Sequence, residues 1–185
     1  TFHKPRFIWR VAAPLISRLA GLGVVYTEAA SNVQYHHRNL HAEVAVIGGG
    51  ISGMSAAINA AASGIRVVLI DDQPSLGGYF RGDPEGNSVI TQLSGQINSC
   101  DNIEVLSVST AFGLYEDNLI GIHTGDTLIK LRTKQVVIAT GSYEIPLSFD
   151  SNDVPGVMLN TGAQRLIRLY GVKPGSRAII ATSND

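Results

Sequence analysis

The residues best suited to chemistry are glycines that follow an apolar segment. Residues 43–50 (EVAVIGGG) are typical of a short buried strand, and Gly48, Gly50 and Gly53 have the spacing G-x-G-x-x-G. In this spacing the first glycine allows a tight turn, the second leaves room for a pyrophosphate, and the third lets a helix approach the strand. Free N–H groups at the start of that helix favour phosphate. The pattern predicts a dinucleotide-binding turn.

An acidic residue follows at the distance that such a turn requires. Residues 51–64 predict an alanine-rich helix and residues 65–72 a second strand, which Asp71 closes 21 residues after Gly50. The Asp71 carboxylate can accept hydrogen bonds from an adenosine ribose and would repel a 2′-phosphate. We therefore expect a βαβ unit that binds an adenine dinucleotide, with NADP disfavoured.

Two further glycine signals support this site. The loop LGGYF (76–80) places a second glycine pair after the acidic residue and adds Gly78 to the candidate cofactor contacts. The segment IATG (138–141) resembles the strand-to-glycine turn that closes the nucleotide domain in two-dinucleotide flavoproteins, and it adds Thr140 and Gly141. Each is common alone, but their order and spacing behind the first motif favour a real nucleotide domain.

Other kinds of chemistry have little support. His36 and His41 lie in a polar stretch with no Cys or Asp to complete a metal site, so we expect no bound metal. Asp71 and Asp72 are consecutive strand residues that point to opposite faces, which argues against an acid–base pair. Cys100 has no partner for a disulfide and indicates a reducing compartment. We predict no catalytic residue in this chain, so that any redox chemistry belongs to a cofactor.

The elements that must position these residues alternate as in an α/β fold. We predict a basic helix within 7–21 and a polar connector in region 1–41, then a Rossmann-like FAD/NAD(P)-binding domain with a β-meander insertion over 42–149. Region 150–185 is expected to hold a crossover helix and, at 178–181, the first strand of a truncated second nucleotide-type domain. The other expected elements are a helix over 88–100, strands over 103–115, 118–124, 127–133 and 134–141, and a helix over 158–171.

Composition limits the remaining possibilities. The chain has 185 residues, 44% of them hydrophobic and 16% charged, which supports a packed core. Its net charge of −1 predicts no nucleic-acid partner, and no apolar run is long enough to span a membrane, so we expect a cytoplasmic protein. Residues 1–41 carry a balance of +4, which suits a helix that docks on a larger body or, alternatively, a transit peptide.

The combined pattern is similar to one family. HAEVAVIGGGISGMSAAINAAASGIRVVLIDDQPSLGG, then STAFGLYEDN, then RTKQVVIATGSYEIPLSFDSNDVPGVMLNTGAQRLIRLYGVKPG, resembles the alpha subunits of heterotetrameric sarcosine oxidases. SNDVPGVML ahead of RLYGVKPG is its most specific part. Alpha-type subunits of amino-acid dehydrogenases, opine oxidases and cyanide-forming glycine oxidases share portions of it. The resemblance implies that this chain is an internal fragment of a longer subunit.

The resemblance also implies a cofactor, partners and an activity. The family holds NAD in the first nucleotide unit, with FAD and FMN in the assembled complex, and it pairs the alpha subunit with beta, gamma and delta subunits. The complex oxidises sarcosine to glycine, forms peroxide and passes a one-carbon unit to tetrahydrofolate. Ser52 departs from the Ala usual in the family, and Asp72 from a common Glu. By position, the implied NAD contacts are Ser52, Asp71, Asp72, Gln73, Tyr79 and Ala111.

Two other functions remain open. The first unit could bind FAD in a subunit that passes electrons from another amine, from proline or from an opine, because the glycine motif recognises an adenosine diphosphate common to both cofactors. Alternatively, the chain could be a structural scaffold with a non-redox dinucleotide, which the lack of catalytic groups favours. A second dinucleotide site is not expected, because Thr182, Ser183 and Asn184 stand where its glycines should be.

Overall fold

The structure is a computed structural model that describes residues 12–13, 16, 19–20 and 35–182. The chain divides into two compact units, Thr1–Gln34 and Tyr35–Asp185, and the second contains every element considered below. The basic helix predicted within 7–21 falls mostly outside the described residues and stays a prediction.

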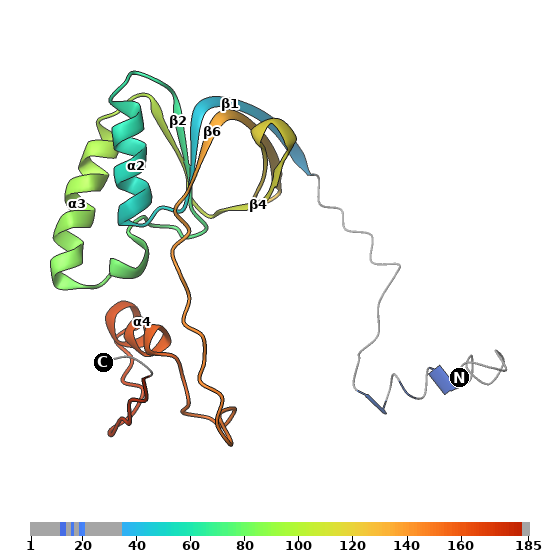
Figure 1. Cartoon of the computed structure of the whole chain (residues 1–185), viewed down its shortest axis with the longest axis vertical. Coiled ribbons are helices and arrows are strands. Elements are labelled where there is room, and N and C mark those ends of the chain that lie inside the picture. Colours follow the sequence, from blue (N-terminus) through green and yellow to red (C-terminus); the bar gives the residue numbers. More distant parts are fainter. Residues whose placement is uncertain (1–11, 14–15, 17–18, 21–34, 183–185) are drawn as a thin grey trace. The chain divides into compact units, whose positions relative to one another are not determined.

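One six-stranded sheet organises the second unit (Figure 1). Its order is β3-β2-β1-β6-β5-β4, in which β3, β2, β1 and β6 are parallel and the β4–β5–β6 meander is antiparallel. The predicted α/β fold with a β-meander insertion is therefore confirmed. The strands are β1 (His36–Ile47), β2 (Val67–Ile70), β3 (Ile103–Leu106), β4 (Ser109–Tyr115), β5 (Leu119–Thr124) and β6 (Thr127–Ile138).

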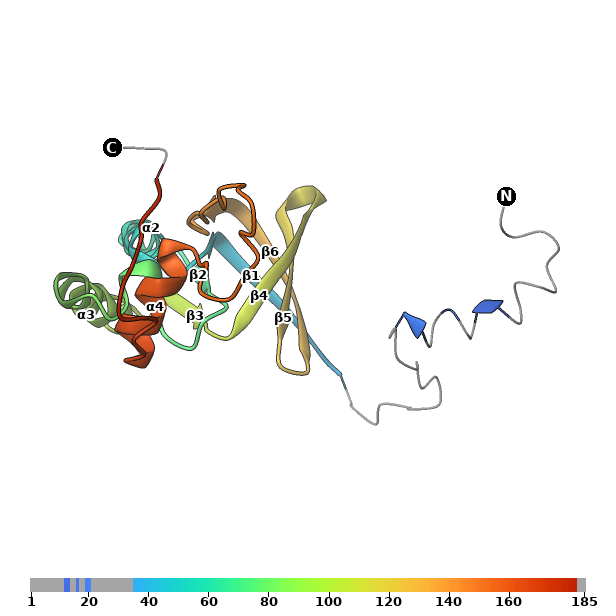
Figure 2. The ribbon, with the colours of Figure 1, turned by 90° about the horizontal axis from the view of Figure 1, so that it is seen from below.

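Helices α2 (Ile51–Ala61) and α3 (Pro84–Asn98) cover one side of the strands, and β4 and β5 lie on the other (Figure 2). Helix α3 begins earlier than the predicted residue 88. Its N-cap is Asp83, whose Oδ2 accepts a hydrogen bond from the Gly86 N–H at 2.9 Å, and proline occupies the first helical turn. Helix α4 (Asn160–Tyr170) follows a long segment without regular structure.

Two apolar clusters form because successive strand side chains point to opposite faces. On β2, Val67 and Leu69 belong to the cluster beneath the helices, whereas Val68 and Ile70 belong to the cluster beneath the meander. Burial of each such side chain contributes roughly 1.5–3 kcal/mol relative to exposure. The fully buried side chains beneath the helices include Met54 and Ala57, and those beneath the meander include Ile120, Ile122 and Leu131.

The long pairing of β1 with β6 corrects two predictions. Residues 36–41, expected as a polar connector, are the first half of β1 and pair with residues 127–132. The segments 127–133 and 134–141, expected as two strands, form the single strand β6, which ends at Ile138. The connector prediction failed because four exposed residues precede the buried Leu40, so apolar alternation is missing although backbone pairing is complete.

The predicted strand at 178–181 is wrong. These residues form no regular structure, and the Ile179 side chain is fully exposed. A strand needs a neighbour to take up its backbone hydrogen bonds, and no strand within 35–182 lies beside this segment. Across the part of the chain that the structure describes, no helix is long and apolar enough to cross a membrane.

Candidate functional site

The first glycine turn is closely packed against the end of β6. Gly48 has a φ of +106°, and a Cβ there would lie 2.2 Å from the carbonyl oxygen of Ala139. A Cβ on Gly53 would lie 1.8 Å from the Gly48 carbonyl oxygen. Both positions therefore require glycine. Because Ala139 belongs to the IATG segment, the first and third glycine signals of the sequence meet at one place.

Gly50 differs from the other two, because open space lies above it. A Cβ at this position would meet no atom within 4 Å, and the φ of −70° is one that any residue adopts. Gly50 is the N-cap of α2, yet no side chain caps the helix and no acidic residue stands in its first turn. The amide N–H groups of that turn are therefore free to bind an anion. Open space beside free amides suits the pyrophosphate of a dinucleotide.

Asp71 holds the turn in place. Its Oδ2 accepts a short hydrogen bond from the Gly49 N–H, and its Oδ1 accepts one of 2.8 Å from the Gln73 N–H. Each carboxylate oxygen can accept a second hydrogen bond. Asp71 can thus bind ribose hydroxyls while it also fixes the backbone on both sides of the site.

The second glycine pair lies along the turn. The Gly77 N–H donates to the Gly49 carbonyl oxygen at 2.8 Å, and Gly50 and Gly77 form a parallel bridge. A Cβ on Gly78 would lie 3.0 Å from the Gly50 Cα. The sequence prediction named Gly78 but missed Gly77, although the glycine pair itself was the signal.

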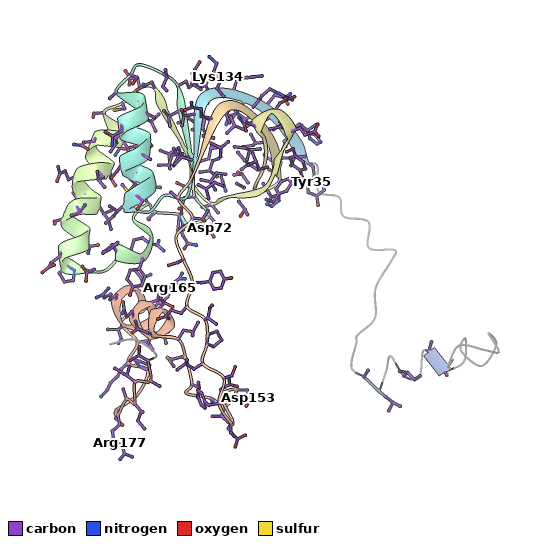
Figure 3. The ribbon with its side chains drawn as sticks, in the orientation of Figure 1. Tyr35, Asp72, Lys134, Asp153, Arg165 and Arg177 are labelled. Carbon is purple, nitrogen blue, oxygen red and sulfur yellow. The ribbon has the colours of Figure 1, made fainter. Side chains whose placement is uncertain are left out.

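Several predicted residues share this end of the sheet. Ser52 is exposed in the first turn of α2, and Thr140 follows the Ala139 contact with Gly48. The Gln73 amide donates from Nε2 to Asp72 Oδ1 at 3.0 Å. Figure 3 shows Asp72 at the end of the strands from which the chain leaves β6. Gly141, with a φ of +78°, has open space around it.

Two predicted contacts have other surroundings. The Tyr79 hydroxyl is hydrogen-bonded to Gln164 Oε1 on α4, so the tyrosine joins the glycine loop to that helix. Ala111 lies within β4, inside the predicted strand region 103–115, where it pairs with Ile122 and packs against the apolar cluster beneath the meander. Both stay predictions as cofactor contacts.

Sequence reasoning also missed two charged residues of the same loop. Arg81 donates from Nη2 to the Gln73 Oε1 at 3.1 Å. Asp83 pairs with Arg168 of α4 at 3.0 Å while it caps α3. No motif marks either residue, because each acts through partners that only the folded loop provides.

The opposite end of the parallel strands holds ion pairs. Glu104 receives hydrogen bonds from Arg38 at 2.7 Å and from Arg66 at 2.8 Å. Partial burial would raise the pKa of Glu104, but the two guanidinium groups outweigh it and hold that pKa below its ordinary value. A hollow of ≈ 360 Å³ beside this cluster, and a second at 176–179, lie away from the glycine turn. Among the described residues no cluster could hold a metal ion.

Comparison with known proteins agrees with the site. The family described as pyridine nucleotide-disulphide oxidoreductase matches residues 42–173. The alpha subunit of sarcosine oxidase from Rhizobium meliloti (strain 1021) is 33% identical, over 100% of this chain and 21% of the relative. An opine oxidase subunit from Agrobacterium tumefaciens (strain Ach5) is 27% identical, over 75% of this chain and 31% of the relative.

A solved structure shows the same fold. The L-proline dehydrogenase from P. horikoshii aligns with a TM-score of 0.68 and 29% identity, over 77% of this chain and 31% of that one. The chain spans about a fifth of the length of the sarcosine oxidase relatives that it matches. The resemblance to sarcosine oxidase alpha subunits is therefore confirmed. The chain belongs to the pyridine nucleotide-disulphide oxidoreductase family, and it has the flavin- or nicotinamide-dinucleotide-binding fold of an oxidoreductase.

Proposed function

We propose that this chain binds NAD at the turn formed by Gly48, Gly50 and Gly53. The single observation that supports it best is the open space above Gly50, beside the uncapped first turn of α2. The pyrophosphate would accept hydrogen bonds from the amides of that turn. The ribose hydroxyls would donate to Asp71, whose carboxylate is already held by the backbone on either side.

The other proposed contacts extend from this centre. Ser52 stands in the first turn of α2, and Asp72 and Gln73 stand on the ribose side. In the loop, Gly78 lies beside Gly50, and Tyr79 follows it. Thr140 and Gly141 close the site from the end of β6. Ala111 lies inside β4, two residues after Ser109, whose N–H donates to the Asp71 carbonyl oxygen at 2.9 Å.

For the whole protein we propose the alpha-type subunit of a sarcosine oxidase-like complex. Sarcosine would be oxidised to glycine with formation of peroxide and transfer of the one-carbon unit to tetrahydrofolate. The complex would be cytoplasmic, with beta, gamma and delta subunits and with FAD and FMN bound in addition to NAD. The support is the 33% identity to a sarcosine oxidase alpha subunit over this entire chain. This chain would supply cofactor binding and no catalytic residue.

FAD is the alternative ligand, and proline or an opine is the alternative substrate. The likeness to an L-proline dehydrogenase and to an opine oxidase subunit favours this second candidate. The glycine turn cannot discriminate between NAD and FAD, because both present an adenosine diphosphate to it.

Mass spectrometry of the small molecule that heat releases from the purified full chain tests the proposal. NAD at about one molecule per chain is the expected result. FAD in its place would overturn the assignment of NAD and support the second candidate. A folded protein that releases neither, and that binds neither when each is added, would overturn the dinucleotide site itself.

A further inference from the structure

Arg81 is a cation without an anion. It is half-buried in the loop after the second glycine pair, and among the described residues it forms no ion pair. Its side chain donates a hydrogen bond from Nη2 to the neutral amide of Gln73, and its buried Nε has no hydrogen-bond partner among the described residues. Partial burial of a guanidinium without a counter-charge is unfavourable. This arrangement indicates that the counter-charge comes from a ligand.

The position of Arg81 links it to the glycine turn. A Cβ on Gly77 would lie 3.0 Å from the Arg81 Cγ, so the arginine stem packs directly on Gly77. Gly77 in turn is bridged to Gly50 and donates to the Gly49 carbonyl. Arg81 therefore lies one residue contact away from the glycine turn, through Gly77.

Neighbouring charges do not neutralise Arg81. Asp83, two residues further on, is engaged by Arg168 and by the Gly86 N–H. Both oxygens of Asp71 accept backbone N–H groups. Between residues 43 and 80 the sole Lys or Arg is Arg66, which pairs with Glu104 at the far end of the strands. Arg81 is thus the first Lys or Arg after the glycine turn that pairs with no described residue.

We propose that Arg81 binds a phosphate group of the dinucleotide, an inference that rests on the proposed function. A planar guanidinium can give two parallel hydrogen bonds to phosphate oxygens, which a single ammonium cannot reproduce. The phosphate is one of the two in the pyrophosphate over Gly50, because the Asp71 carboxylate would repel a 2′-phosphate on the ribose. Arg81 also orients the Gln73 amide, so a binding role must be separated from a positioning role.

Calorimetry on the full chain, in the assembly in which it purifies and after removal of resident cofactor, tests this proposal. The probes are adenosine, ADP, NAD and NADP. Arg81→Gln should weaken binding of ADP and NAD by about tenfold, as expected for a charged hydrogen bond, and leave adenosine unchanged. Arg81→Lys should lie between the wild type and Arg81→Gln. A loss confined to NADP would overturn the contact with the pyrophosphate.

The same four probes serve for the control variant and for the results that would overturn the proposal. Arg165→Gln removes one exposed positive charge from α4 and should change no affinity; Figure 3 shows Arg165 on that helix. Unchanged binding of every probe by Arg81→Gln, or an equal loss for adenosine and ADP, would overturn the phosphate role. A folded wild type that binds no probe would instead overturn the proposed function. If Arg81→Gln unfolds, an unweakened affinity of Arg81→Lys for all probes overturns the bidentate contact.

Discussion

The two ends of the parallel strands differ in whether their polar groups have partners within the protein. At the amino end, Arg38 and Arg66 close on Glu104, and Lys134 approaches Glu43 at 3.9 Å. At the carboxyl end, the glycine turn leaves open space beside backbone amides, and Arg81 forms no ion pair with any residue that the structure describes. Figure 3 shows Lys134 and Asp72 at these opposite ends.

This difference shows that charge density alone does not mark a binding site. At the amino end the ionised side chains pair with one another. At the carboxyl end the first turn of α2 has no side-chain cap, and the Arg81 Nε has no hydrogen-bond partner among the described residues. Ligands of open α/β sheets bind outside the carboxyl ends of the strands, where helix amino termini gather. The hydrogen-bonding groups that lack partners lie at the carboxyl end, where that rule places a ligand, whereas the ion pairs lie at the amino end.

Gly53→Ala should give the largest effect, because it disrupts the carboxyl end outright. Its Cβ would lie 1.8 Å from the Gly48 carbonyl oxygen, which is backbone and cannot move aside. We expect a loss of unfolding free energy of at least ~3 kcal/mol and no measurable dinucleotide binding. Chemical denaturation and calorimetry check this. Gly95→Ala is the matched control, because it is an exposed glycine of α3 with open space, and should stabilise by roughly 0.5–1 kcal/mol.

Gly50→Ala should separate binding from folding. The methyl group meets no protein atom within 4 Å, so stability should change by no more than ~1 kcal/mol, the usual range for an N-cap change. The same methyl group would occupy the proposed pyrophosphate position and should weaken NAD at least ~10-fold, equivalent to about 1.4 kcal/mol. A variant that binds NAD as tightly as the wild type would contradict the placement of the ligand. This test is cleaner than Asp71→Ala, which would also release Gly49 and Gln73.

Glu104→Gln should affect the amino end only. Loss of two partly exposed ion pairs is expected to cost about 0.5–1 kcal/mol of unfolding free energy, with NAD affinity unchanged. Because the pKa of folded Glu104 is lowered, its stabilisation is present above the ordinary glutamate pKa and declines as the pH falls through the folded value. Denaturation at neutral and at acidic pH should therefore show a smaller difference between variant and wild type in acid. Weaker NAD binding would mean that the two ends are coupled.

Glu144→Gln should produce the smallest and most local change. The Glu144 carboxylate accepts hydrogen bonds from the Thr161 N–H and hydroxyl, both at 2.8 Å, in the first turn of α4. The Thr161 backbone bond, then its hydroxyl, lowers the pKa of Glu144. Its support of α4 should therefore be present above the ordinary glutamate pKa and be lost as the pH falls through the folded value. Amide hydrogen exchange of Thr161 should be faster in the variant at neutral pH; identical exchange would contradict the contact.

The sequence by itself determined the local parts of the site. The positions of Gly48, Gly50 and Gly53 and the distance to Asp71 follow from one strand–turn–helix unit, whose contacts span few residues. The alternation of the first strands and helices, and the presence of a meander, were likewise readable from apolar periodicity and turns. The division into strands was not, because the strand predicted over 103–115 is two strands, β3 and β4. These features are set by short-range geometry, so a linear pattern is sufficient to predict them.

The tertiary structure alone decided the features that depend on distant partners. Residues 36–41 are a strand because β6 takes up their backbone hydrogen bonds, and 178–181 are not a strand because no neighbour within the described chain does so. The hydrogen bond from the Gly49 N–H to Asp71 forms only once the loop folds against the turn. The same folding buries the Arg81 Nε without a hydrogen-bond partner among the described residues. Hydrogen-bond satisfaction is a property of the assembled neighbourhood, and neither residue type nor spacing reveals it.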